Sequence, residues 1–342
     1  MSGEAGANRR MPCYRSSAPV RLDFAGGWTD VDPFASEERG VVVNAAIELR
    51  AEVELRPGGD DYRVESEDLG RTITLAGRDP LRTDGPLGLL TAALRHAALG
   101  PSALRTRCRA PAGSGLGSSG ALDVALVAAI DLARGISRPP AELAEEAFLL
   151  ESVDAGLPGG RQDQYAAALG GMHHLTFERG KVTVRPIALD PSFRTELERH
   201  VVICYTGVSR ISSRAIERVI EAYRRNDLRV AGALRELVGV AEEMAGALAS
   251  GDFPCIGRLL DRNWELQQRL DPGMCTAEMA VLESVMRRAG ALGGKAAGAG
   301  AGGSMFFVVE DEPRALRAAG EAGATVIPFT WAAEGVRREA IS

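Results

Sequence analysis

Lysine is almost missing from this chain of 342 residues, since only Lys181 and Lys295 among its 40 basic residues are lysines. We attribute this bias towards arginine to the base composition of the genome. Acidic residues number 46, the net charge at pH 7 is -6, and the arginines do not gather into a basic stripe. Nucleic acids and anionic membranes are therefore not expected as partners.

Cysteines and long apolar stretches are also scarce. The five cysteines are widely spaced, no two have the spacing of metal ligands, and their odd number indicates reduced thiols. No apolar stretch is free of charges for long enough to span a membrane, and the first dozen residues lack the apolar core of a signal peptide. These absences predict a cytoplasmic protein that folds without disulfides or structural metal ions.

The length and the hydrophobic fraction of 45% suit two soluble domains. Apolar and charged residues alternate over residues 47–56, as in an antiparallel strand with one face in water. Further strands are predicted near residues 20–24, 62–65, 72–75, 104–110, 172–177 and 182–187. Helices are predicted over residues 87–99, 121–133 and 163–169, together with one that begins at Pro139 and Pro140 and carries Glu151.

Helices predominate after Asp190. They are predicted over residues 213–225, 228–249, 253–269, 276–289 and 313–321, among strands at 201–205, 305–309 and 325–329. Strands and helices mix without a regular βαβ alternation, so the expected class is α+β. The predicted organisation is a flexible N-terminal tail (residues 1–18), an N-terminal domain (19–185) and a C-terminal domain (186–342).

The strongest functional signal is the segment Pro111-Ala112-Gly113-Ser114-Gly115-Leu116-Gly117-Ser118-Ser119. Its glycines permit tight turns that point several N–H groups at one anion, and a helix is predicted to begin where it ends. Ser118 and Ser119 add hydroxyls for a phosphate oxygen or for Mg²⁺. The absence of a following lysine excludes a Walker A loop, and the antiparallel surroundings argue against a dinucleotide fingerprint. Taken alone, such a short run is better explained as a flexible connection.

Three segments in this order resemble the GHMP kinases, named for galactokinase, homoserine kinase, mevalonate kinase and phosphomevalonate kinase. Arg21-Leu-Asp-Phe-Ala-Gly-Gly-Trp-Thr-Asp30 is similar to their sugar-facing motif, Gly115-Leu-Gly-Ser-Ser119 to their ATP phosphate loop, and Lys295-Ala-Ala-Gly-Ala-Gly-Ala-Gly-Gly-Ser304 to their third motif. The resemblance extends over about residues 19–309. It implies a ribosomal-protein-S5-domain-2-like N-terminal domain and a ferredoxin-like C-terminal domain, with the active site between them and ATP and Mg²⁺ as cofactors.

Residues 24–30, 158–165 and 205–210 resemble one branch of that superfamily, which contains D-glycero-D-manno-heptose 7-phosphate 1-kinases and L-fucokinases. Those enzymes phosphorylate the anomeric hydroxyl, so the resemblance implies a sugar 1-kinase acting on heptose 7-phosphate or a similar phospho-sugar. One alternative is a kinase for another sugar or a cyclitol, such as an octose phosphate or fucose. An ATP-dependent decarboxylase is disfavoured by the sugar motif. A non-catalytic sensor of sugar and ATP would lack part of the catalytic set, which is complete here.

The resemblance also implies roles for single residues. Asp163 matches the catalytic aspartate, which accepts the hydroxyl proton or holds the hydroxyl in line with the γ-phosphate, and Arg21 matches the basic residue beside it. Glu151 matches the glutamate that binds Mg²⁺ together with Ser118 or Ser119. Without the resemblance, Asp163 would be interpreted as a helix cap, Arg21 as a surface residue and Glu151 as part of a solvated helix face.

The remaining implied roles concern the nucleotide and the sugar. Nucleotide binding is expected from Pro111, Gly113, Ser114, Gly115, Leu116, Gly117, Ser118, Ser119, Gly298, Gly300 and Gly302. Sugar binding is expected from Gly27, Trp28, Thr29, Asp30, Gly160, Gln162 and Arg210. Asp30 matches a residue that binds sugar hydroxyls, although a turn-forming aspartate also fits beside two glycines. For a phospho-sugar, Arg210 and Arg214 on one side of a helix are predicted to bind the phosphate, unless both face solvent.

Three residues depart from the family pattern. Gly120 replaces a common alanine after the two serines, Ala297 replaces a common serine, and Trp28 replaces a small or polar residue. We interpret the first two as tolerable. The ring of Trp28 would stack on a pyranose, shorten the pocket or pack within the protein, so this substitution leaves the identity of the sugar open.

Overall fold

The computed structural model describes residues 12–208 and 212–341, and it contains two β-sheets. In the first sheet β12-β1-β2-β5-β3-β4 are successive neighbours, while β6 and β7 extend from another part of β2. Its pairs are antiparallel except for β3 with β5. The strands are β1 (Cys13–Ala25), β2 (Gly40–Pro57), β3 (Asp61–Ser66), β4 (Arg71–Ala76), β5 (Ser102–Cys108), β6 (Met172–Glu178), β7 (Lys181–Pro186) and β12 (Arg337–Ile341).

The long strand β2 joins the two parts of this sheet. Residues 40–45 pair with β6, whereas residues 51–57 pair with β5. In the second part, Val53 and Leu55 are buried while Glu52 and Glu54 lie on the wetter face, as the alternation predicted. The first part is buried along its whole length, as is usual for a strand that is covered on both faces.

Four helices cover one face of the first sheet: α2 (Gly88–Ala97), α3 (Ser118–Arg134), α4 (Pro140–Leu149) and α5 (Gln162–Leu169). Helix α3 packs directly on β1 and β2, and this position explains why it is apolar nearly all round. A π-helical turn, η1 (Leu150–Asp154), continues α4 and leads into the loop before α5. A short helix, α1 (Phe34–Glu37), follows β1.

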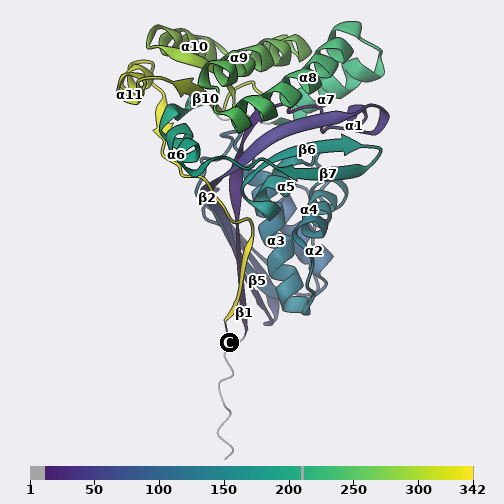
Figure 1. Ribbon diagram of the computed structural model, residues 1–342. Helices are drawn as coiled ribbons and strands as arrows, with labels where there is room; N and C mark the ends of the chain where they lie inside the picture. The colour runs from purple at the N-terminus through teal and green to yellow at the C-terminus, as the bar shows by residue number, and fades with distance from the viewer. Residues whose placement is uncertain (1–11, 209–211, 342) are drawn as a thin grey trace, which may run out of the picture.

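The second sheet has the antiparallel order β11-β8-β10-β9. Its strands are β8 (Val201–Tyr205), β9 (Ala291–Ala296), β10 (Ser304–Val309) and β11 (Thr325–Ile327). The accompanying helices are α6 (Pro191–His200), α7 (Ser212–Arg224), α8 (Leu228–Ser250), α9 (Phe253–Leu270), η2 (Pro272–Met274), α10 (Ala277–Arg288) and α11 (Glu312–Glu321). Figure 1 shows α8, α9 and α10 as an upper layer, with the first sheet and its helices below.

Helix starts differ between the two parts of the chain. Asp190, Asp227, Asp252, Thr276 and Asp311 each accept a hydrogen bond from backbone N–H groups at the start of the helix that follows. By contrast, Gly117 precedes α3 and provides no side chain to satisfy the N–H groups there. The first turn of α3 therefore keeps its hydrogen-bond donors for another partner.

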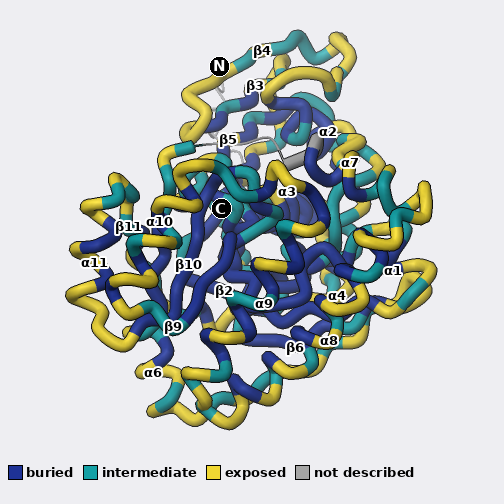
Figure 2. The backbone as a smooth tube through the Cα atoms, turned by 90° about the horizontal axis from the view of Figure 1, so that it is seen from above, coloured by how far each residue is buried: buried dark blue, intermediate teal, exposed yellow. Residues whose placement is uncertain are grey.

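The two sheets meet at β1. Phe24 of β1 packs edge-on against Phe306 of β10, with the ring centroids 5.4 Å apart, and α8 lies against β1 and β2. Seen from above, the backbone of β2, β9 and β10 is buried at the centre, and exposed segments surround it (Figure 2). This shared core places the end of β1 where both parts of the chain can contribute to one site.

The α+β class is confirmed, with differences in detail. Residues 13–18, predicted as part of the tail, belong to β1, which is paired on both sides. The predicted boundary near residue 185 falls at the end of β7, and β12, near the end of the chain, returns to the first sheet beside β1. Helix α6 and strands β9 and β12 were not predicted. Across the described ranges, no helix combines the length and the apolar character needed to cross a membrane.

Candidate active site

A cleft of about 350 Å³ lies where the three sequence motifs meet. Residues from β1 and the turn after it form one side, the segment before α3 forms another, and the loop before α5 completes it. Its lining is Arg21, Asp23, Gly27, Trp28, Asp30, Val31, Gly113, Ser114, Gly115, Gly117, Ser118, Ser119, Glu151, Leu157, Pro158, Gly159, Gly160, Gln162, Asp163, Ile216, Gly298 and Ala299. Most of the residues predicted for the site are thus brought together.

The glycine-rich segment forms a tight loop before α3. Gly113, Gly115 and Gly117 have φ angles of +70°, +78° and +79°, which favour glycine. The hydroxyls of Ser114 and Ser118 are buried without a hydrogen-bond partner. Together with the uncapped N–H groups of α3 and the positive end of its dipole, they provide donors for phosphate oxygens.

The third motif packs against this loop. The N–H of Ser304 donates to the carbonyl of Ser114 over 2.7 Å, and a Cβ atom on Gly298 would lie 2.5 Å from the carbonyl oxygen of Gly115. Gly298 lines the cleft, but Gly300 faces Met274 and the N–H of Gly302 donates to the sulfur of Met279. Gly300 and Gly302 thus lie in the turn behind the loop and outside the lining of the cleft, and their contact with nucleotide stays a prediction.

Two phosphate-loop residues also lie outside the lining. The side chain of Leu116 is fully buried, and its carbonyl accepts the N–H of Arg21 over 2.8 Å. Pro111 accepts the N–H of Ser114 at the start of the loop. Both residues support the loop and do not line the cleft, so their contact with nucleotide stays a prediction.

Arg21 and Asp163 form an ion pair in the cleft. The Nε atom of Arg21 lies 2.7 Å from Oδ1 of Asp163, and its Nη1 atom donates to the carbonyls of Gly115 (2.7 Å) and Ala297 (3.1 Å). Arg21 is almost completely buried. The carboxylate of Asp163 does not cap α5, so the helix-cap interpretation is wrong. Arg21 thereby joins all three motifs at the side chain predicted to be the base.

Glu151 lies in the π-helical turn, a geometry often found at functional sites. Its Oε2 atom accepts a hydrogen bond from the amide of Gln164 over 2.8 Å. Burial and the nearby Asp163 carboxylate raise the pKa of Glu151 to about 7, against the opposing hydrogen bonds from Ser119 and Gln164. Glu151 is therefore buried within the cleft wall and does not lie on a solvated helix face.

Asp123 was missed by the sequence analysis. It lies one turn after Ser119 in α3, is fully buried, and has no hydrogen-bond partner at either carboxyl oxygen. Burial, followed by the charge of Glu151, raises its pKa well above the usual value. The sequence did contain a signal for Asp123, because an acidic residue four positions after Ser119 interrupts an otherwise apolar stretch.

The raised pKa of Glu151 makes the stability of the metal-free protein depend on pH. A carboxyl group whose pKa rises from 4.5 to about 7 on folding binds more protons in the folded state, so stability is lost as the pH rises through this window. As the pH rises through this window, we expect the free energy of unfolding to fall by about 3 kcal/mol because of Glu151. Glu151→Gln should remove it, as urea unfolding between pH 4.5 and pH 8 would measure.

The control for this experiment is Glu142→Gln, which alters an exposed carboxylate in the preceding helix. It should leave the pH dependence of the wild type unchanged. If Glu151→Gln lost stability with pH as steeply as the wild type, the burial of a protonated Glu151 would be contradicted.

The end of the cleft formed by the first motif is built around Asp30. Its Oδ2 atom accepts the N–H of Gln162 over 3.0 Å, and burial together with the charges of Asp163 and Asp23 raises its pKa to about 6. A Cβ atom on Gly160 would lie 2.0 Å from this Oδ2 atom, so only glycine leaves room for the carboxylate. Asp30 is therefore held in the cleft wall by contacts specific to this loop.

The other predicted sugar ligands divide into three groups. Gly27, Trp28, Gly160 and Gln162 line the cleft. Thr29 does not line it: this residue is fully buried, and its hydroxyl donates to the carbonyls of Gly26 and Val41. These bonds stabilise the turn, and the contact of Thr29 with sugar stays a prediction. Arg210 lies outside the described residues.

Gly120 has a larger role than the sequence indicated. A Cβ atom on Gly120 would lie 2.5 Å from Cβ of Asp163 and 3.1 Å from N of Gln164. We expect Gly120→Ala to push α5 away from α3, at a cost of about 1–3 kcal/mol in stability. Displacing Asp163 by about 1 Å should lower kcat about 10²-fold with little effect on the KM for ATP.

A matched control is Gly239→Ala, because Gly239 is also inside a helix but has open space where the Cβ atom would be. This variant should retain kcat and gain slightly in stability from the better helix propensity. Unchanged kcat in the Gly120→Ala enzyme would contradict the close packing of Asp163.

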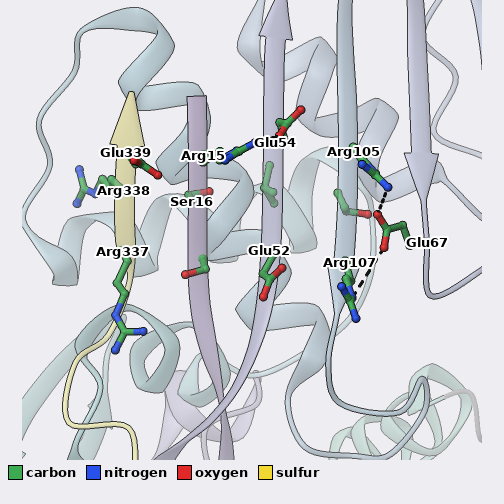
Figure 3. Close-up of a pocket in the computed structure, with 13 residues that line it drawn as sticks. Arg15, Ser16, Glu52, Glu54, Glu67, Arg105, Arg107, Arg337, Arg338 and Glu339 are labelled. Atoms are coloured by element: carbon green, nitrogen blue, oxygen red, sulfur yellow. Dashed lines mark hydrogen bonds and ion pairs between the residues drawn. The ribbon is translucent and has the colours of Figure 1, made fainter. Parts of the chain in front are cut away.

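A larger hollow of about 630 Å³ lies on the outer face of the first sheet, across β12, β1, β2 and β5 (Figure 3). Several of its charged side chains pair with one another: Arg15 with Glu54 at 2.8 Å, for example, and Arg107 with Glu67 at 3.8 Å. Arg105, Arg107 and Arg109 all pair with glutamates, in agreement with a solvated sheet face instead of an anion site. The cleft at the three motifs is therefore the better candidate for the active site.

Comparisons with known proteins agree with this choice. The family profile for the GHMP kinases N terminal domain matches residues 88–171, and that for the GHMP kinases C terminal matches residues 244–326. The D-glycero-alpha-D-manno-heptose 7-phosphate kinase of Campylobacter jejuni is 28% identical over 340 residues, which cover 96% of this chain and 99% of that protein. The L-fucokinase/L-fucose-1-P guanylyltransferase of Bacteroides fragilis is 29% identical over 332 residues, 88% of this chain and 35% of that protein.

Among solved structures, a D-glycero-D-manno-heptose 1-phosphate kinase from Bacteroides thetaiotaomicron superimposes with a TM-score of 0.79. The sequence identity is 28%, and the superposition covers 96% of this chain and 99% of the other. The similarity thus extends over both sheets and all three motifs.

Proposed function

The chain belongs to the GHMP kinase superfamily and is an ATP-dependent phosphotransferase, and on this premise we propose that it phosphorylates the anomeric hydroxyl of a heptose 7-phosphate or a similar phospho-sugar. The observation that carries the proposal is the position of Asp163. Its carboxylate is tied by Arg21 to the carbonyl of Gly115, so a base lies directly beside the phosphate loop.

The described side chains suit direct transfer. The N–H groups at the start of α3 bind phosphate oxygens of ATP, and Asp30 orients the sugar through its hydroxyls. Asp163 accepts the proton of the acceptor hydroxyl. As it does so, the hydroxyl oxygen bonds to the γ-phosphorus, and the bond between that phosphorus and the ADP oxygen breaks. Arg21 stabilises the negative charge spread over the transferring group. We expect no phosphorylated enzyme, because the loop provides no nucleophile except two serines, and these are suited to binding a phosphate oxygen or Mg²⁺.

The cleft also fits Mg²⁺. Ser119 and Glu151 line the cleft and would supply the hard oxygen ligands that Mg²⁺ prefers, beside the phosphate oxygens of the nucleotide. Among the described residues, no group of three or more His, Cys, Asp or Glu side chains could by itself hold a metal ion. Bound there, Mg²⁺ would neutralise charge on the phosphates. We assign Ser119 as the ligand in preference to Ser118, because Ser119 lies within hydrogen-bond reach of Glu151.

One observation favours a second candidate, a kinase for an unphosphorylated sugar such as L-fucose. Arg21 is the single cation among the described residues that line the cleft, and it is engaged by Asp163. The sugar-facing end instead carries the carboxyl groups of Asp23 and Asp30. A sugar phosphate would thus depend on cations outside this lining, such as the predicted Arg210.

A coupled ADP-release assay over hexoses, deoxyhexoses and heptose or octose phosphates tests the proposal, with the product identified by phosphorus NMR. We expect sugar-dependent ADP release and a phosphorus signal from a phosphate on the anomeric carbon. Turnover with L-fucose but not with heptose 7-phosphate would favour the second candidate. Binding of ATP and sugar without ADP release would instead indicate a non-catalytic sensor.

A further inference from the structure

A fully buried ion pair joins the two sheets directly behind the cleft. The Nζ atom of Lys295, on β9, lies 3.0 Å from Oδ2 of Asp23 and 2.7 Å from the backbone carbonyl of the same residue, on β1. Lys295 has no exposed surface and Asp23 is 2% exposed. A buried charge pair of this kind costs desolvation energy, so its presence beside the cleft calls for an explanation beyond stability.

The identity of the cation is informative in this chain. Only two of the 40 basic residues are lysines, and the other, Lys181, lies in the exposed β6–β7 hairpin. The Nζ atom of Lys295 sits in a compact space, with the ring centroid of Phe306 5.7 Å away. A compact ammonium fits two acceptors from one residue there, whereas the planar guanidinium of arginine needs more room and a different geometry.

Asp23 also belongs to the cleft. It is part of the lining, and its Oδ1 atom is buried without any hydrogen-bond partner. A Cβ atom on Gly27 would lie 2.1 Å from Oδ2 of Asp23 and 3.1 Å from the side-chain amide of Gln162. The carboxylate of Asp23 thus fills the space that a side chain at position 27 would occupy, and Lys295 holds it there.

Two further polar atoms in the same wall lack partners: Nε1 of Trp28 and Oε1 of Gln162, both buried. With Oδ1 of Asp23 they form a set of two acceptors and one donor. Sugar hydroxyls donate and accept, so they match this set, whereas a phosphate dianion brings only acceptors and a charge of the same sign as Asp23 and Asp30. Buried polar atoms without partners in a cleft wall indicate groups that a ligand satisfies.

We propose that Asp23 determines specificity for a neutral, hydroxyl-bearing end of the acceptor, to which it accepts a hydrogen bond at Oδ1. Lys295 is a positioning residue, which balances the charge of Asp23 and fixes its carboxylate beside Gly27. The inference rests on the proposed sugar kinase function. It places the hydroxyl-bearing part of the sugar against Asp23, Trp28 and Gln162, and any phosphate group elsewhere.

The decisive experiment compares Asp23→Asn, Lys295→Met and the double variant, with Lys181→Met as the control for loss of a lysine. Each single variant leaves one charge buried without its partner and therefore loses stability, whereas the double variant removes both charges and should keep a near-native Tm. The KM for L-fucose and for heptose 7-phosphate is measured separately from the KM for ATP, and sugar binding without ATP is measured by calorimetry.

In the double variant we expect the KM and the Kd for the sugar to rise about 10–100-fold, as for loss of a hydrogen bond to a charged group, with the KM for ATP unchanged. Lys295→Arg should not preserve the native sugar KM. A stable double variant with native sugar KM and Kd would overturn the inference and leave the kinase assignment intact. A wild-type protein that binds neither sugar would contradict the proposed function, and with it this inference.

Discussion

Replacing Asp163 with asparagine is expected to abolish most of the turnover while the fold and nucleotide binding remain. The amide cannot accept the proton of the acceptor hydroxyl, and loss of a positioned base typically lowers kcat by about 10²–10⁴-fold. The shape of the side chain is kept, so the contact with Gly120 is preserved. Steady-state kinetics with the sugar identified by the ADP-release assay, together with calorimetric ATP binding, would measure both effects.

Asp32→Asn is a suitable control. Asp32 follows the turn that carries Asp30, but it lies at the surface and is paired with Arg161 at 3.7 Å. It should retain kcat within a small factor. Near-native kcat in the Asp163→Asn enzyme would show that the aspartate is not the base, and the proposed mechanism would fall.

Replacing Arg21 with methionine is expected to reduce both activity and stability. The methionine side chain fills much of the same volume but donates no hydrogen bond, so Asp163 and the carbonyls of Gly115 and Ala297 all lose their partner. Removal of a preorganised charged donor should lower kcat about 10²–10³-fold. Breaking a largely buried pair should cost about 3 kcal/mol in the free energy of unfolding.

Arg21→Lys provides the comparison, since it restores the charge but not the planar fork. An ammonium group cannot reach one carboxylate and two carbonyls at once, so kcat should remain well below that of the wild type. Full activity of Arg21→Lys would indicate that charge alone matters, and that the link between the three motifs does not.

The parts of the fold that were predicted are those with a strong local pattern. The alternation over residues 47–56 and the apolar stretch over residues 121–133 each reflect one buried face or one buried helix. Strand β9, with the sequence Ala-Leu-Gly-Gly-Lys-Ala, has low strand propensity and is held by its pairing with β10. Strand β12 is polar because it lies at the edge of the sheet, so its pattern alone does not distinguish it from a loop.

Helix α6 is different, because its start signal was present and was overlooked. Asp190 accepts hydrogen bonds from the N–H groups of Ser192 and Phe193, and Pro191 occupies the first helical position. This combination is typical of a helix start.

The candidate site also combines features that have a local sequence pattern with features that depend on packing between distant residues. The glycines and serines of residues 111–119 were a local signal, but they indicated a phosphate loop only together with the other two motifs, because such a run alone also fits a flexible connection. The pairing of Asp23 with Lys295 joins residues 272 positions apart, and no local pattern indicates it. The contact of Gly120 with Asp163 likewise depends on packing between distant segments.

The return of β12 to the first sheet has a practical consequence for dissecting the protein. Expressing residues 19–185 alone would remove residues 13–18 of β1 and all of β12, so residues 51–55 of β2 would lose their neighbour on that side and become an open edge. Exposed edges recruit strands from other molecules, and such a fragment would tend to aggregate. A soluble version should therefore retain residues 13–18 and carry residues 337–341 grafted through a linker, so that the antiparallel partner of β1 is supplied in the same molecule.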